Sequence, residues 1–157
     1  MHKIIRSTLL PEDKNNTFDL LKNPKVMTFL GPRRALSECE ANDWFNNELQ
    51  NTHRFAFRLA SNNELIGFCG ITDINESNED LDFGYFIREK FWGCGFAAIM
   101  CQQSIDHLKN EIDFNNIKVF IADENIASLR LAKKLNWTLI KKDSNEYETG
   151  LLFQIRS

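Results

Sequence analysis

The sequence predicts a single α/β (α+β) domain, residues 1–157, in which helices flank a mixed central sheet. The length of 157 residues is close to that of one ordinary domain. Hydrophobic residues make up 43% of the chain and charged residues 26%, which are the proportions of soluble globular proteins. The period of the hydrophobic pattern alternates along the chain between two and about 3.6, and no repeat or low-complexity linker divides it.

The N-terminal part is predicted to form one strand and two helices. Residues 4–9 read as a strand, and Pro11 with the acidic residues after it begins a helix that runs to about residue 22. A short segment follows at 26–30. Ser37 then caps a second helix that runs to about residue 50, because Glu40 stands at the capping-box position.

A meander of three strands is predicted next. Residues 53–60 alternate large apolar side chains with Arg or Ala, the period-two pattern of a half-buried strand. Residues 65–71 form its hairpin partner after a polar turn. A polar loop at 73–80 leads to a third strand at 81–87.

The C-terminal part returns to alternating helices and strands. Apolar positions three or four apart predict a helix over 95–108, followed by a strand at 117–122, a helix at 125–135 and closing strands at 137–141 and 146–155. A right-handed crossover through the first of these helices would make strand 117–122 a parallel neighbour of strand 81–87. This crossover is why we expect a mixed sheet.

Composition and cysteine spacing exclude several classes of function. The 19 Lys and Arg against 22 Asp and Glu leave a net charge of -3, with no basic block for a nucleic acid. The four cysteines form no C-x-x-C pair, which argues against a zinc site or a redox dithiol, and we expect no metal. Without an apolar run near 18 residues or a signal-peptide pattern, we expect a cytoplasmic protein with no membrane association.

The stretch with most chemical information is 91–98, FWGCGFAA, where a strand passes through a glycine turn into a helix. Gly93 and Gly95 allow close backbone approach, and the N–H groups of the first helical turn can hold a pyrophosphate. A tight turn that uses glycine for geometry alone remains an alternative.

Gly93 and Gly95 with Ala98 also match the dinucleotide-binding fingerprint G-x-G-x-x-G/A. That fingerprint requires an acidic residue about 20 positions further on, at the end of the next strand. Asp113 lies before that strand, and Asp123 ends it too late. The context therefore argues against a dinucleotide-dependent enzyme.

Four segments together resemble the GNAT acetyltransferase superfamily, and most closely its RimJ/RimL-type branch. Segment 91–97 is similar to the branch's YWGKGYA, although Trp92 stands where the wider superfamily often has Gln or Arg. Segment 23–31, NPKVMTFLG, is similar to DPEVMRYLG. Segment 83–85, FGY, resembles IGY, and 125–137, NIASLRLAKKLNW, resembles NxxSxxxxxKLGF.

This resemblance implies acetyl-CoA as co-substrate and a splayed pair of parallel strands that admits its pantetheine arm. The backbone of Tyr85, Phe86 and Ile87 is then expected to hold the pantetheine. Asn125 is expected to contact the cofactor from the second strand. The pyrophosphate would lie on the turn and first helical residues, Trp92, Gly93, Cys94, Gly95, Phe96, Ala97 and Ala98.

The resemblance also implies direct transfer without a metal, in which the amine loses a proton and the leaving thiolate gains one. Ser128 matches the motif serine and is expected to protonate the thiolate, although a serine there is often only a local backbone partner. The tyrosine that the family often carries further along this helix is replaced by Ala132. Asp82 is the expected base, with Glu79 and Asp80 as neighbouring alternatives.

The acceptor implied by the branch is the primary amine of a protein N-terminus. A small amine such as an amino acid, polyamine or antibiotic is the alternative, and a non-catalytic acyl-CoA-binding module is a third hypothesis. The first 50 or so residues are expected to shape the acceptor pocket, with Phe29, Trp44 and Phe45 as its walls. Assembly as a homodimer is left open.

Overall fold

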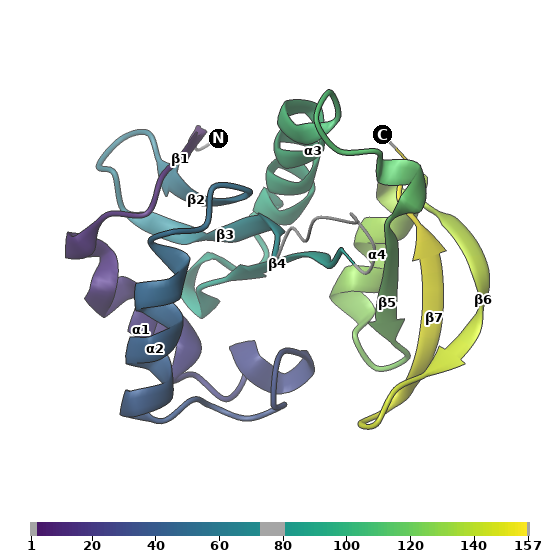
Figure 1. Ribbon diagram of the computed structural model, residues 1–157, viewed down its shortest axis with the longest axis horizontal. Coiled ribbons are helices and arrows are strands. Elements are labelled where there is room, and N and C mark those ends of the chain that lie inside the picture. The colour runs from purple at the N-terminus through teal and green to yellow at the C-terminus, as the bar shows by residue number, and fades with distance from the viewer. Residues whose placement is uncertain (1–2, 73–80, 157) are drawn as a thin grey trace.

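The computed structural model describes residues 3–72 and 81–156, and within these ranges the strands form two antiparallel sheets (Figure 1). The first sheet has the order β1-β2-β3-β4 and the second the order β5-β7-β6. The strands are β1 Ile4–Ser7, β2 Arg54–Leu59, β3 Leu65–Ile71, β4 Phe83–Ile87, β5 Lys118–Ala122, β6 Thr138–Ser144 and β7 Thr149–Gln154.

Helices connect and cover these sheets. They are α1 Lys14–Leu21, α2 Glu38–Glu48, α3 Phe96–Leu108 and α4 Ile126–Lys134, with 3₁₀ turns η1 Pro11–Asp13, η2 Val26–Phe29, η3 Glu89–Phe91 and η4 Phe114–Asn116. The predicted order of helices and strands is confirmed, with boundaries shifted by a few residues. The predicted loop at 73–80 lies outside the described residues.

The N-terminus of α2 follows the predicted capping box. The Glu40 backbone N–H donates to Ser37 Oγ at 3.2 Å, and the Ser37 backbone N–H donates to Glu40 Oε1 at 2.9 Å. These reciprocal bonds satisfy two N–H groups at the helix entrance. Local sequence therefore sets where α2 begins.

Strand β2 is buried on both faces, which the alternating pattern did not predict. Phe57 packs in the cluster that contains α3 residues, whereas Ala56 packs against Leu20 of α1. The guanidinium of Arg58 is buried, and its charge is compensated because Asp13 accepts hydrogen bonds from both Nη groups, at 2.7 and 2.5 Å. Helices thus cover both faces of the first sheet, and the prediction that one face of β2 is exposed to solvent is wrong.

The sheets separate between β4 and β5. Within the described residues, β4 pairs with β3 and β5 pairs with β7, and each ladder is antiparallel. The α3 crossover connects β4 to β5 without a ladder between them, so the expected mixed sheet is interrupted at the point where a splayed strand pair was expected. One hydrophobic cluster still joins both sheets, with Phe83, Ile105, Leu131 and Phe153 among its members.

In the part of the chain that the structure describes, we find no helix with the length and apolar character needed to span a membrane.

Candidate active site

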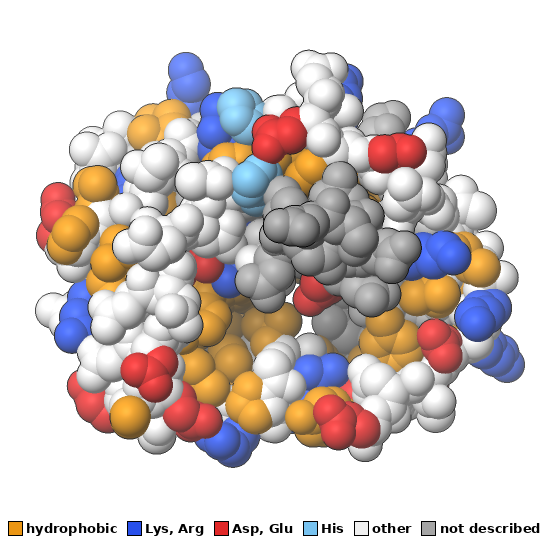
Figure 2. Space-filling model, viewed as in Figure 1, with side chains coloured by type: hydrophobic (Ala, Val, Ile, Leu, Met, Phe, Trp, Pro, Cys, Tyr) orange, Lys and Arg blue, Asp and Glu red, His pale blue; other side chains and the backbone are white. Residues whose placement is uncertain are grey.

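A cavity of about 720 Å³ lies where the edges of β4 and β5 separate. Its walls come from β4, β5, the turn and helix start at 91–98, one face of α4, and the segment from Lys25 to Arg33. Figure 2 shows a hollow between the two halves of the molecule, with hydrophobic side chains exposed inside it. The interrupted sheet therefore provides room for a ligand beside a strand edge.

The register of β4 determines which backbone groups face this cavity. Phe86 pairs with Phe68 of β3, and the Arg88 N–H donates to the Ile66 carbonyl at 2.9 Å. Because backbone groups alternate in direction along a strand, those of Phe86 point toward β3. The structure therefore corrects the expectation that the Phe86 backbone holds pantetheine, although its side chain lines the cavity.

The backbone groups of Tyr85 and Ile87 point the opposite way, toward the gap between the sheets. The Trp92 indole N–H donates to the Ile87 carbonyl at 2.9 Å. This bond anchors the turn before α3 to the strand edge. The Ile87 N–H and the N–H and carbonyl groups of Tyr85 then form the edge of β4 that faces the cavity. This placement is consistent with their predicted role in bonding to the pantetheine.

The N-terminus of α3 has the geometry of an anion site. Gly93 and Gly95 both have φ of 77°, and no side chain caps the helix. A Cβ at either glycine would meet no heavy atom within 4 Å. The turn is therefore open toward the cavity, and the N–H groups of Phe96, Ala97 and Ala98 form the positive end of the helix dipole.

Two other residues of this turn have different environments. Trp92 is 48% exposed and borders the cavity. Cys94 is exposed, its Sγ lies 3.9 Å from the Trp92 carbonyl oxygen, and it is absent from the described cavity lining. The predicted contact of Cys94 with the pyrophosphate stays a prediction.

The hydroxyl groups of Tyr85 and Ser128 meet beside the cavity. Their Oη and Oγ atoms are 2.8 Å apart and form a hydrogen bond. Burial raises the pKa of the Tyr85 phenol, although the bond to Ser128 opposes this change. The phenol therefore remains protonated near neutral pH and is available as a proton donor.

Asn125 positions the start of α4. It is the N-cap residue, and its Oδ1 accepts from the Ser128 N–H at 3.3 Å. The asparagine thus has a structural role beside its predicted contact with the cofactor. Further along α4, Ala132 is fully buried. Tyr85 instead places a phenol from β4 beside Ser128, which makes it an alternative proton donor in addition to its predicted backbone role.

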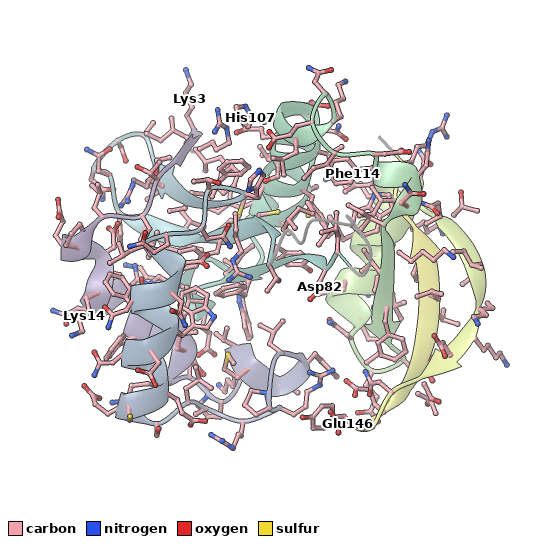
Figure 3. All side chains as sticks on the ribbon, in the orientation of Figure 1. Lys3, Lys14, Asp82, His107, Phe114 and Glu146 are labelled. Carbon is pink, nitrogen blue, oxygen red and sulfur yellow. The ribbon has the colours of Figure 1, made fainter. Side chains whose placement is uncertain are left out.

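Asp82 precedes β4 and lines the cavity. Its side chain is exposed, and Figure 3 labels it at the opening between the two halves of the molecule. The Asp82 carbonyl accepts a hydrogen bond from the Thr72 N–H at 2.9 Å, which extends the β3–β4 hydrogen-bonding pattern by one residue. The alternative bases Glu79 and Asp80 lie outside the described residues.

The cavity has two sides because side chains from both faces of β4 line it. Tyr85 belongs to the face that packs toward α3 and α4, whereas Phe86 belongs to the face that packs toward α1 and α2. Strand alternation places Asp82 on the Phe86 face. The gap between β4 and β5 thus connects a side with Tyr85 and Ser128 to a side with Asp82.

The segment after α1 forms part of the second side, with Phe29 in the cavity wall. The other two expected wall residues lie elsewhere. Trp44 packs edge-on against Phe68 and Phe86, with ring centroids 5.3 and 5.5 Å apart. Phe45 is 3% exposed and belongs to the core. Neither is among the described lining residues, and Trp44 supports the sheet beside the cavity through its contact with Phe86.

Among the charged side chains that line the cavity, basic ones outnumber acidic ones. Lys25, Arg33, Arg130 and Lys134 line it, and Asp82 is the acidic residue among the described lining residues. Arg130 and Lys134 lie one turn apart on α4, which suits an anionic co-substrate. Among residues 3–72 and 81–156, no group of three or more His, Cys, Asp or Glu side chains is arranged to hold a metal ion.

Comparison with known proteins identifies the family. The family model for the acetyltransferase (GNAT) domain matches residues 4–138. The chain belongs to the GNAT acetyltransferase family. Members of this family use acetyl-CoA, so this GNAT protein is an acetyltransferase with acetyl-CoA as donor, as the motifs predicted.

Individual relatives agree with this assignment. An uncharacterized N-acetyltransferase p20 from Bacillus licheniformis is 26% identical over 131 residues, which cover 80% of this chain and 74% of the relative. A GNAT-family acetyltransferase from Bacillus anthracis superposes with a TM-score of 0.78 at 16% identity, covering 98% of this chain and 95% of that one.

A spermidine N-acetyltransferase from Vibrio cholerae, solved with CoA and spermine, has a TM-score of 0.73 at 20% identity, covering 96% of this chain and 95% of that one. At such identities the two solved structures establish a shared fold.

Proposed function

We propose that this GNAT protein transfers the acetyl group of acetyl-CoA directly to the primary amine of a protein N-terminus, as a member of the RimJ/RimL-type branch. The amine nitrogen forms a bond to the thioester carbonyl carbon, and the carbon–sulfur bond breaks. The amine loses one proton, and the CoA thiolate gains one. The main support is the cavity at the gap between β4 and β5, which has the hydroxyl pair of Tyr85 and Ser128 on one side and the Asp82 carboxylate on the other.

The donor binds on the α3 and α4 side in this proposal. The Tyr85 and Ile87 backbone groups bond to the pantetheine as an added strand would. The first-turn N–H groups of α3 hold the pyrophosphate, helped by the open space above Gly93 and Gly95. Asn125 contacts the cofactor from the start of α4. These contacts place the thioester beside Ser128.

Two groups handle the protons. Ser128 donates one proton to the leaving thiolate, the Tyr85 phenol replaces that proton on Ser128 through their hydrogen bond, and solvent then reprotonates Tyr85. Asp82 accepts the proton of the amine on the opposite side of the strand edge. This division agrees with the face of β4 on which each group lies.

The cavity wall on the Asp82 side favours an acceptor that has a single amine next to an uncharged group. Phe29, Leu30, Gly31 and Phe86 line this side together with the cationic Lys25 and Arg33, and Asp82 is the acid in the described lining. A polyamine carries several cations, and several carboxylates would be needed to bind them all. A peptide N-terminus presents one amine beside an amide and a side chain, which the observed lining accommodates.

The experiment is an acetyl-CoA thiol-release assay with matched acceptors. One peptide has a free N-terminus, a second has the same sequence with the N-terminus acetylated and a free lysine, and spermidine and free amino acids complete the set. Mass spectrometry locates the acetyl group. We expect turnover with the free N-terminus and none above background with the blocked peptide.

Other outcomes contradict parts of the proposal. Turnover of spermidine or an amino acid without turnover of the peptides would establish the small-amine alternative. Acetyl-CoA binding with no acceptor turned over would support an acyl-CoA-binding module. Each outcome is read in the same assay, with calorimetry as the binding measurement.

A further inference from the structure

Arg33 has an unusual backbone conformation for its residue type. Its φ is 62°, and the other described non-glycine residues with positive φ are Asn63 and Asn136. Asparagine tolerates the left-handed region well, whereas arginine there costs about 1–2 kcal/mol. Contacts of the Arg33 side chain must offset this cost, and such conformations concentrate at ligand sites.

Those contacts come from three directions. Arg33 Nε donates to Glu148 Oε1 at 3.0 Å and Nη2 to Oε2 at 3.5 Å, while Nη1 donates to the Gly31 carbonyl at 2.9 Å. The guanidinium also lies 4.5 Å from the ring centroid of Tyr147. We call the pair Arg33 and Glu148, with the Tyr147 ring, the clasp.

The clasp is more protected than the surface ion pairs of this protein. The side chains of Arg33 and Glu148 are each 21% exposed. By comparison, the ion pair of Lys22 with Glu38 is 46% and 66% exposed. Lower exposure reduces screening by water and salt, so the clasp constrains its two segments more strongly than an ordinary surface pair.

The clasp connects parts of the molecule that no β-ladder joins in the described chain. Arg33 follows η2, and Glu148 lies in the turn between β6 and β7, 115 residues away. Figure 3 labels Glu146 in this turn, at the end of the hairpin near the segment that follows η2. Arg33 itself lines the cavity, as does Asn145 of the same turn as Glu148, so the clasp joins two segments that both contribute to the cavity wall.

We propose that the clasp of Arg33 and Glu148 is a positioning device that fixes the acceptor wall and thereby sets how tightly and in what orientation the amine acceptor binds. This inference rests on the proposed function, because it requires an acceptor on that side. A wall displaced by about 1 Å can lower the rate about 10²-fold through lost alignment. The donor contacts at α3 and β4 are separate from the clasp.

The test uses Arg33→Asn, which keeps a residue suited to positive φ and removes the guanidinium, and Glu148→Gln, which removes the charge with little change in shape. The matched control is Arg34→Asn. Arg34 makes a bidentate ion pair with Glu40 at 2.7 and 2.9 Å, but its side chain is 57% exposed and absent from the described cavity lining.

Both clasp variants are expected to lower acceptor kcat/KM about 10²-fold, with a lower kcat because alignment is lost and a higher KM because the acceptor binds less tightly, while the calorimetric Kd for acetyl-CoA stays within about twofold. The double variant should lose no more than either single variant, because the two residues act as one unit. Hydrogen exchange should increase in the β6–β7 turn of both clasp variants and remain unchanged in Arg34→Asn.

Unchanged acceptor kcat/KM in the clasp variants, with an active wild type, would overturn the inference and leave the proposed function standing. An equal loss in Arg34→Asn would also overturn it, because the effect would then be a general one of surface charge. A wild type that turns over no amine would refute the proposed function first, and the inference would fall with it.

Discussion

Replacement of Gly95 by aspartate or asparagine tests the anion site with a matched pair of variants. Both side chains tolerate the observed φ of 77°, and the space above Gly95 is free within 4 Å. Two unit charges about 5 Å apart at an effective dielectric of about 20 repel by about 3 kcal/mol. CoA should therefore bind about 100-fold more weakly to Gly95→Asp than to Gly95→Asn.

Isothermal titration calorimetry with CoA at low and high salt measures this ratio, which should shrink as salt screens the repulsion. Thermal unfolding provides the control. Because an aspartate at the N-cap favours the helix, Gly95→Asp should melt no lower than Gly95→Asn. Equal CoA affinities in the two folded variants would refute the assignment of the pyrophosphate to this helix start.

Four further predictions concern proton transfer and stability. Ser128→Ala and Tyr85→Phe should each lower kcat, Ser128→Ala by about 10²–10⁴-fold, with acetyl-CoA affinity nearly unchanged. The double variant should lose less kcat than the product of the two single fold-losses. Full kcat in both single variants would remove the hydroxyl pair from the mechanism. Because burial raises the pKa of Tyr85, any alkaline fall in kcat from this group should occur at a higher pH than an ordinary tyrosine would give, and a fall at or below the ordinary tyrosine range would contradict this assignment. Asp82→Asn should reduce the rate most at low pH, with recovery toward the pKa of the acceptor amine, whereas a uniform loss across the pH profile would assign Asp82 to structure or acceptor binding. Arg58→Met leaves the buried Asp13 carboxylate unpaired and should lower the free energy of unfolding, measured in urea, by about 3–5 kcal/mol. The double variant Arg58→Met with Asp13→Asn should lose less stability than Arg58→Met alone. An equal or greater loss in the double variant would refute this account.

Elements that depend on neighbouring residues were predictable from the sequence. The capping box at Ser37 and the glycine turn before α3 act within one helical turn, so their signals lie within a few residues. The type and order of helices and strands followed in the same way from periodicity. The family motifs added the donor, because their residues lie in these same local segments.

The faces and partners of the strands required the whole fold. The alternation in β2 predicted one solvent face, but α1 and α2 cover that face and Asp13 pairs with Arg58 from 45 residues away. Likewise, the orientation of the Phe86 backbone depends on its register with β3. Neither feature leaves a signal in the local sequence, because both depend on which segment packs opposite.

The sequence by itself determined the elements of this protein, its family motifs and the helix start that suits a pyrophosphate. The tertiary structure alone brought Tyr85 to Ser128 across 43 residues and Arg33 to Glu148 across 115. Short-range signals such as caps, turns and hydrophobic periods operate within one or two turns of chain. Contacts between distant side chains arise when the two sheets pack around one core, and the separation of β4 from β5 then decides which of those side chains share a cavity.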